Sequence, residues 1–142
     1  MQKNVGPGAA RQYGINNTNE PYIMFIDTGD YFFDNIFNNI INIITNDSET
    51  DVFAWQHISE KSKKVSKNTD NHLHGKVYKR EFLNNHNIQF CKESSYANED
   101  IGFNRICRLL TKIKFFNQPI YMWTNDPNSL TRRDNNSFSY KN

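Results

Sequence analysis

Two pairs of carboxylates stand where side chains could bind a ligand or move a proton. Asp27 and Asp30 directly follow a continuous apolar run, residues 22–26, which predicts a strand buried on both faces as in a parallel sheet. The carboxyl end of such a strand is where α/β sheets bind ligands. Glu99 and Asp100 begin an amphipathic segment, where the helix dipole favours acidic side chains. Structural alternatives stay open. Asp27 and Asp30 could simply cap the turn after the strand, and Asp100 could serve as a helix N-cap without any catalytic role.

Histidines, lysines and cysteines offer fewer chemical possibilities. His72 and His74 have the spacing of metal ligands, but no cysteine or acidic cluster adjoins them, so we expect a solvated loop. Cys91 and Cys107 adjoin no basic motif and are expected to be ordinary reduced thiols. A lysine-rich segment is expected to be solvated, with a phosphate-rich acceptor as the functional alternative; its lysines are Lys61, Lys63, Lys64 and Lys67.

Strands that alternate with helices predict an α/β sheet around these residues. Small side chains in residues 4–14 allow close backbone approach, and Pro7 can begin a helix there. The other expected elements are a helix over 34–46 capped by Asp34, a strand over 52–58, an exposed loop over 60–71, a strand over 76–78 that leads into a short helix over 81–85, and a last strand over 120–123. The helix that begins at Glu99 is expected to bury its apolar side, with Ile101, Ile106, Leu109, Leu110 and Ile113.

Length and composition limit the possible classes. The chain has 142 residues and a net charge of +2, which fits one domain without a strong polyanion-binding surface. No apolar run approaches the ~20 residues of a membrane span, there is no leader pattern, and aromatic residues at 14 % argue against disorder. A soluble cytoplasmic protein is therefore expected. The 22 asparagines suggest an AT-rich genome such as that of a phage or large virus, in which case the location is the host cytoplasm.

Four segments in order resemble family 2 glycosyltransferases of the GT-A fold. The segment from Gly6 to Gly14, followed by residues 22–30, is similar to the block "GxGxARNxG … YIxFLDSDD". Residues 75–83 resemble "GKLYRREFL", and residues 99–104 resemble "ED(x)xFN". The closing segment, residues 120–132, is similar to "YYYR…SITR". The resemblance covers about residues 6–132.

The resemblance implies a fold and a set of partners. It predicts a Rossmann-like mixed sheet flanked by helices over residues 1–132, without the N-terminal βαβ unit of the family, and a polar tail over 133–142. The implied donor is a nucleotide sugar, most simply a UDP-sugar, and the acceptor a glycan or modified DNA. The expected companions are a complementing N-terminal chain or a second copy of this chain, because the missing unit would leave a sheet edge unpaired.

Roles for single residues follow from the same resemblance. Asp100 would be the general base, with Glu99 beside it, and Asp27 and Asp30 would hold Mn²⁺ or Mg²⁺. Arg11, Asp27, Lys76 and Arg132 would bind the donor. Gly29 stands where the family has the second aspartate of its metal motif, which weakens the expected site. A non-catalytic remnant or interaction module of the same fold is therefore the alternative function.

Overall fold

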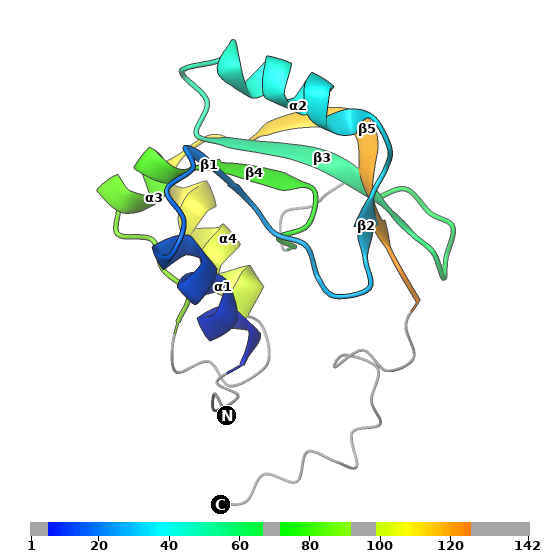
Figure 1. The fold of residues 1–142 in the computed structure, drawn as a ribbon, viewed down its shortest axis with the longest axis horizontal. Helices are drawn as coiled ribbons and strands as arrows, with labels where there is room; N and C mark the ends of the chain where they lie inside the picture. The colour runs from blue at the N-terminus through cyan, green and yellow to red at the C-terminus, as the bar shows by residue number, and fades with distance from the viewer. Residues whose placement is uncertain (1–5, 67–71, 92–98, 126–142) are drawn as a thin grey trace, which may run out of the picture.

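The computed structural model describes residues 6–66, 72–91 and 99–125. Along the chain the elements are α1 (Pro7–Asn16), β1 (Tyr22–Met24), β2 (Tyr31–Phe32), α2 (Ile36–Thr45), β3 (Val52–Ser59), β4 (Lys76–Lys79), α3 (Arg80–Asn85), α4 (Glu99–Leu110) and β5 (Lys114–Trp123). The strands form one sheet in the order β1-β4-β3-β5-β2 (Figure 1). The predicted α/β class with a mixed sheet is confirmed. None of the helices in these ranges is long and apolar enough to cross a membrane.

Strand directions in the sheet are mixed. β3 and β5 run parallel, whereas β1 with β4, β4 with β3, and β2 with β5 are antiparallel. The prediction of a parallel strand over residues 22–26 is wrong in both direction and burial. β1 ends at Met24, lies at one end of the described sheet and buries only Ile23 fully. Its apolar run instead continues into Phe25, which packs against the core beyond the strand.

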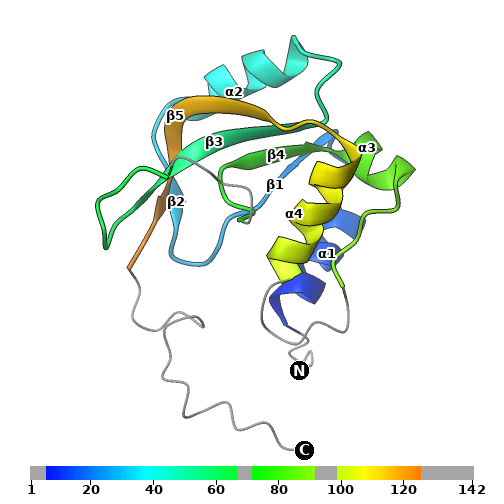
Figure 2. The same cartoon turned by 180° about the vertical axis from the view of Figure 1, so that it is seen from behind.

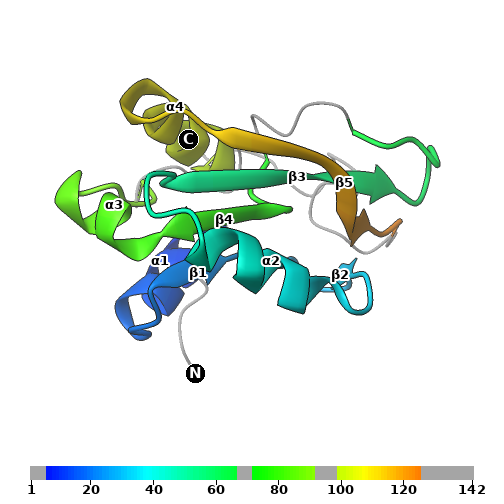
Figure 3. The same ribbon diagram turned by 90° about the horizontal axis from the view of Figure 1, so that it is seen from above.

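The alternation of side chains along β3 divides the core into two layers. Val52 and Ala54 face one cluster of buried residues, while Phe53 and Trp55 face the other. α2 covers the second cluster through isoleucines at helical spacing, Ile36, Ile40 and Ile44. α1, α3 and α4 lie on the opposite face, as the views from behind and from above show (Figures 2 and 3). The sheet is therefore buried between one helix and three.

Two helix predictions need correction. The helix expected over 34–46 begins at Ile36, and its N-cap is Asn35, not Asp34, with a left-handed φ of 60° and no side-chain capping bond. Asn tolerates this conformation better than most residues do. The strand over residues 52–58 is confirmed as β3, and the change from strand to helix near residue 80 is confirmed at the β4–α3 junction. The last strand, expected over 120–123, begins earlier, at Lys114.

α4 buries a different face from the one expected. Its buried residues are Glu99, Phe103, Asn104 and Cys107, whereas Leu109 is 85 % exposed and Ile106 and Leu110 are also exposed. Phe103 stacks on Phe90, with ring centroids 4.2 Å apart. Both rings belong to the core, so the Phe103 side of the helix faces inward. Because Glu99 binds an arginine of α1, the buried stripe follows the polar motif and not the most apolar side of the helix.

Candidate functional site

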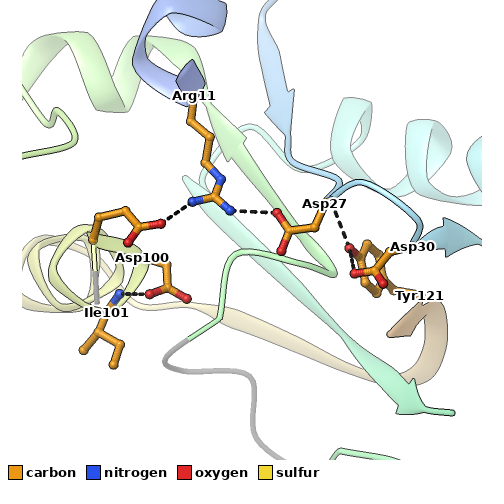
Figure 4. A network of polar contacts seen from close by, with 7 residues as sticks. Arg11, Asp27, Asp30, Asp100, Ile101 and Tyr121 are labelled. Carbon is orange, nitrogen blue, oxygen red and sulfur yellow. Dashed lines mark hydrogen bonds and ion pairs between the residues drawn. The ribbon is translucent and has the colours of Figure 1, made fainter. Parts of the chain in front are cut away.

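Arg11 joins three elements on the side of the sheet that holds α1 and α4. Its Nη2 donates to Asp27 Oδ1 at 2.7 Å, and its Nη1 donates to Glu99 Oε1 at 2.6 Å (Figure 4). The Glu99 side chain is only 8 % exposed, whereas that of Asp27 is 51 % exposed. We call Arg11, Asp27 and Glu99 the arginine bridge. It brings three of the predicted site residues together although they are distant in sequence.

The charges of the arginine bridge stabilise one another. Burial disfavours the charged form of Arg11, but hydrogen bonds and attraction from Asp27 and then Glu99 outweigh that effect and raise the pKa of the guanidinium. α1 can approach because of Gly8: a Cβ at that position would lie 3.0 Å from Glu99 Cγ. The expectation that small residues in this segment permit close approach is confirmed at Gly8.

Asp100 lies next to the arginine bridge in the first turn of α4. Its Oδ1 accepts a hydrogen bond from the backbone N–H of Ile101 at 2.8 Å (Figure 4). Its backbone carbonyl accepts a second bond from Asn104 Nδ2 at 2.9 Å. The carboxylate is half-buried at the helix N-terminus. Asp100 is therefore a carboxylate of the first helical turn that satisfies a free backbone N–H, and it does not occupy the N-cap position. The contact is compatible with a base whose other oxygen faces an acceptor.

Asp30 has a different environment from Asp27. Its Oδ2 accepts from the Tyr121 hydroxyl at 2.6 Å, and its Oδ1 accepts from the backbone N–H and the hydroxyl of Thr124. Burial, and then the bond to Asp30, raise the pKa of Tyr121 well above its ordinary value. The Tyr121 hydroxyl also accepts from the backbone N–H of Asp27 at 3.2 Å. Asp30 thus fixes the turn after β1 to the end of β5, and its oxygens already have protein donors.

The metal prediction has limited support in this geometry. Among the described residues, no group of three or more histidine, cysteine or acidic side chains is arranged to hold a metal ion. Gly29 has no ligand atom and a φ of +90°, and Asp30 is bound to β5. Asp27, with its exposed carboxylate, is the better candidate ligand. A divalent cation at Asp27 would need further oxygen ligands from a bound diphosphate and from water.

The two remaining predicted donor-binding residues have different outcomes. Lys76 is fully buried, and its Nζ donates to the His72 carbonyl at 2.6 Å and to Asn104 Oδ1 at 3.1 Å. Arg132, the domain boundary at residue 132 and the polar tail lie outside the described residues. The predicted roles of both basic residues stay predictions.

Three histidines pack together beside the site. His57 of β3 lies 4.4 Å from His74 between ring centroids, and His74 stacks on His72 at 4.9 Å. We call these residues the histidine cluster. Tyr121 and Trp123 of β5 pack against it, with Tyr121 stacked on His74 at 4.9 Å. His72 and His74 lie in the loop before β4, as predicted, but that part of the loop is not solvated. His74 is 7 % exposed, His72 is half-buried, and both rings pack against Trp123 of β5.

Burial keeps the histidine cluster neutral. It lowers the pKa of His57 to about 4 and that of His74 still further, with repulsion from the other histidines and Lys76 adding to the effect. Burial also lowers the pKa of His72, but Asp100 and Asp27 oppose that shift through their negative charge. His72 is therefore electrostatically linked to both candidate site carboxylates. His57 Nδ1 and His74 Nε2 are buried, and within the described residues neither has a hydrogen-bond partner.

Sequence reasoning missed several residues that shape this site. Asn104 and Tyr121 stood in the motifs of residues 99–104 and 120–132 but received no role, and Thr124 gave no signal of its own, because their partners lie tens of residues away along the chain. The lysines in the described part of the 60–71 loop are exposed as expected, and they are Lys61, Lys63 and Lys64. A hollow of about 330 Å³ between β1 and α3 contains none of the site carboxylates.

Comparisons with known proteins agree with this fold. The model of the family "Glycosyl transferase family 2" matches residues 1–108. Among solved structures, S. aureus TarS 1-349 in complex with UDP superposes with a TM-score of 0.73 at 19 % identity, covering 86 % of this chain and 41 % of that one. The complex of TarS 1-349 with UDP-GlcNAc gives a TM-score of 0.74 at 17 % identity, covering 88 % and 40 %.

This chain covers less than half of each matched structure. A structure of S. aureus TarS matches with a TM-score of 0.73 at 20 % identity, and this chain covers only 25 % of it. The chain therefore spans about two-fifths of TarS 1-349 and a quarter of that TarS chain. No curated protein matches the sequence. At these identities the structures show the fold, a GT-A arrangement of mixed sheet and helices.

Proposed function

The chain belongs to glycosyl transferase family 2, and on that premise we propose that it transfers a sugar from a nucleotide-sugar donor to an acceptor hydroxyl. The observation that carries the proposal is the arginine bridge with Asp100 beside it. It places a cation, an exposed carboxylate and a candidate base on one side of the sheet. TarS is crystallised with UDP and with UDP-GlcNAc, which favours a UDP-sugar as the donor here.

The proposed reaction assigns one task to each residue. Asp100 accepts the proton of the acceptor hydroxyl, whose oxygen forms a bond to the anomeric carbon of the sugar. The bond between that carbon and the diphosphate breaks, and the nucleoside diphosphate leaves with its electrons. Arg11 offsets the negative charge that grows on the leaving group. Glu99 holds Arg11 in place and contributes no proton transfer.

Asp27 is the proposed ligand for Mn²⁺ or Mg²⁺, with Asp30 as support through the turn. A divalent cation would supply additional charge compensation for the diphosphate. Because Asp27 Oδ1 also binds Arg11, metal and arginine would share one carboxylate. We expect metal affinity to depend strongly on the nucleotide, which would provide the missing oxygen ligands.

Calorimetric titration of the 142-residue chain with UDP, with and without Mn²⁺, tests donor binding. We expect heat of binding that depends on the metal. A chain that binds no UDP under either condition would contradict the proposal. It would favour the second candidate, a non-catalytic module of the same fold that works with a partner chain or a second copy of itself. Gly29, and the bonds that occupy Asp30, are the observations in favour of that candidate.

Replacement of the base tests the chemical step. Asp100→Asn should reduce sugar transfer by about 100-fold or more and leave UDP binding intact, since the amide accepts no proton at neutral pH. Asp34→Asn removes an exposed carboxylate from the segment before α2 and should change neither. Equal transfer rates in the two variants would show that Asp100 is not the base.

The acceptor is proposed to be a glycan or modified DNA. Exposed Lys61, Lys63 and Lys64 are the feature that would favour a polyanionic acceptor. Transfer to hydroxymethylated duplex DNA should then weaken steeply as salt rises, because phosphate contacts release counterions. Transfer to an oligosaccharide that is insensitive to salt would identify a glycan acceptor instead.

A further inference from the structure

A buried polar network connects β4 to the first turn of α4. Asn104 Oδ1 accepts two hydrogen bonds, from the Tyr78 hydroxyl at 2.8 Å and from Lys76 Nζ at 3.1 Å. Asn104 Nδ2 donates to the backbone carbonyl of Asp100 at 2.9 Å. Asn104, Lys76 and Tyr78 are all completely buried. The amide of Asn104 therefore has both its oxygen and its nitrogen in defined bonds.

The same lysine fixes the loop before β4. Lys76 Nζ also donates to the His72 carbonyl, and the neighbouring Gly75 accepts from Trp55 N–H at 2.8 Å. Gly75 has a φ of +73°, and a Cβ there would lie 2.8 Å from the Trp55 carbonyl oxygen. Residues 75–78 thus join β3, the histidine cluster and α4 in one rigid unit. Lys76 is completely buried and its ammonium group donates to two protein acceptors, as expected of a residue that supports the fold.

We propose that Asn104 is a positioning residue for Asp100 and that Lys76 and Tyr78 hold Asn104 in place. This inference rests on the proposed function of Asp100 as the base. Asn104 fixes the carbonyl of Asp100, while Ile101 N–H fixes its carboxylate. The Ile101 bond holds the carboxylate itself, and the Asn104 bond acts on it through the backbone of the first turn of α4. Buried, fully satisfied polar networks of this kind specify one geometry, because every alternative leaves a polar group without a partner.

Asn104→Asp separates positioning from simple support of the fold. The new carboxylate can still accept from Lys76 and Tyr78, so the link between β4 and α4 remains. Its second oxygen would face the Asp100 carbonyl, where the amide had donated, and this contact is repulsive. Asn38→Asp makes the same change at an exposed position of α2 and is the matched control.

Two readouts distinguish positioning from structure. In transfer assays, Asn104→Asp should lower kcat about tenfold or more with the donor KM unchanged within about twofold, and move the acidic limb of the pH profile of kcat upward. The added negative charge disfavours an ionised Asp100, which causes that upward movement. Among the described residues, the charged or titratable groups around Asp100 include Glu99 with its partner Arg11, and His72, Lys76 and Tyr78, and all of these are present in both the variant and the wild type.

The second readout is independent of activity. The amide proton of Ile101 reports the ionisation of Asp100 through their hydrogen bond, so its NMR shift can be followed against pH. We expect a smaller amplitude and a higher midpoint in Asn104→Asp, and no change in Asn38→Asp. An unchanged Ile101 titration in a folded Asn104→Asp variant would overturn the positioning role. If the wild type transfers no sugar, the proposed function fails, while this titration still decides the inference.

A milder variant covers the case in which Asn104→Asp does not fold. Tyr78→Phe keeps the ring and deletes only the hydroxyl that binds Asn104 Oδ1. We expect the amplitude of the Ile101 titration to fall by less than in Asn104→Asp, because Lys76 still holds the amide. An amplitude equal to that of the wild type would contradict the role of Tyr78 in the network.

Discussion

The arginine bridge and the histidine cluster both lie close to Asp27 and Asp100, but different forces hold each of them together. On the α1 side, three charged side chains are held by short ion pairs. On the β5 side, three imidazoles pack together, His74 is stacked on Tyr121 and Trp123, and burial keeps the rings neutral. The comparison shows how one site can combine a charged, ion-paired region with an uncharged aromatic region. The first depends on electrostatic pairing and the second on close packing.

The largest effect is expected where the histidine cluster is fixed to the sheet. Gly75→Ala would combine an unfavourable left-handed conformation with a Cβ 2.8 Å from the Trp55 carbonyl oxygen. We expect a loss of about 3 kcal/mol in the free energy of unfolding, measured with urea. Gly14→Ala in α1, where nothing lies within 4 Å of an added Cβ, should instead stabilise by about 0.5–1 kcal/mol.

Breaking the arginine bridge should have the next largest effect. Arg11→Met leaves the carboxylate of Glu99 buried without its cation, and we expect a loss of about 2–3 kcal/mol in the free energy of unfolding at pH 7. Lys114→Met breaks the pair with Asp47, in which the lysine side chain is 50 % exposed, and is the control, which should change stability less because the remaining carboxylate keeps its bonds to Thr50. Equal losses in the two variants would mean that the bridge behaves as an ordinary surface ion pair.

Acid should affect the histidine cluster in a defined pH range. The pKa of His57 is about 4 in the folded chain and ordinarily 6.5, so the unfolded chain binds the proton first as pH falls. The free energy of unfolding does not depend on the charge of His57 above pH 6.5, where the ring is neutral in both the folded and the unfolded chain. It decreases as the pH falls from 6.5 toward 4, by about 1–2 kcal/mol for His57 after allowing for solvent screening. Urea titrations over this range should show a shallower decline in His57→Gln. The same slope in both proteins would contradict a buried neutral His57.

The smallest effect is expected at the turn after β1, where Asp30 binds Tyr121 of β5 whereas Asp27 binds Arg11. Tyr121→Phe removes the hydroxyl that donates to Asp30 and accepts from the backbone N–H of Asp27, while Asp30 keeps its two bonds to Thr124. We expect a loss of about 1 kcal/mol in the free energy of unfolding. Thermal unfolding monitored by circular dichroism would measure it. A stability unchanged from the wild type would indicate that Thr124 alone holds the turn.

Local patterns predicted much of the fold. Isoleucine spacing located α2, the apolar segment from Val52 located β3, and the motif residues 75–83 located the β4–α3 junction. The face of α4 was wrong because Phe90 and Arg11, both distant in sequence, decide its orientation. The direction of β1 was wrong for a related reason: an apolar run indicates burial but contains no information about the direction of its neighbour.

The candidate site was only partly accessible to the same reasoning. Arg11, Asp27 and Glu99 came from the family motifs, and the structure brings them together. The bonds that hold Asp30 to Tyr121 and Thr124 join residues that are 91 and 94 positions apart, and no local pattern encodes such a contact. The burial of His72 and His74 could not be predicted for the same reason, because the aromatic rings that cover them come from β5, which is distant in sequence.

The place of β5 in the sheet has a consequence for how the chain folds. It is the last of the described strands in sequence, but it lies between β3 and β2, and β2 has β5 as its pairing partner. During synthesis, β3 has an open edge and β2 has no strand to join until residues 114–123 have left the ribosome. Such pairings between distant segments slow folding, because loop closure must precede the contacts that reward it. We therefore expect refolding on the millisecond-to-second timescale, with completion of the sheet as its late event.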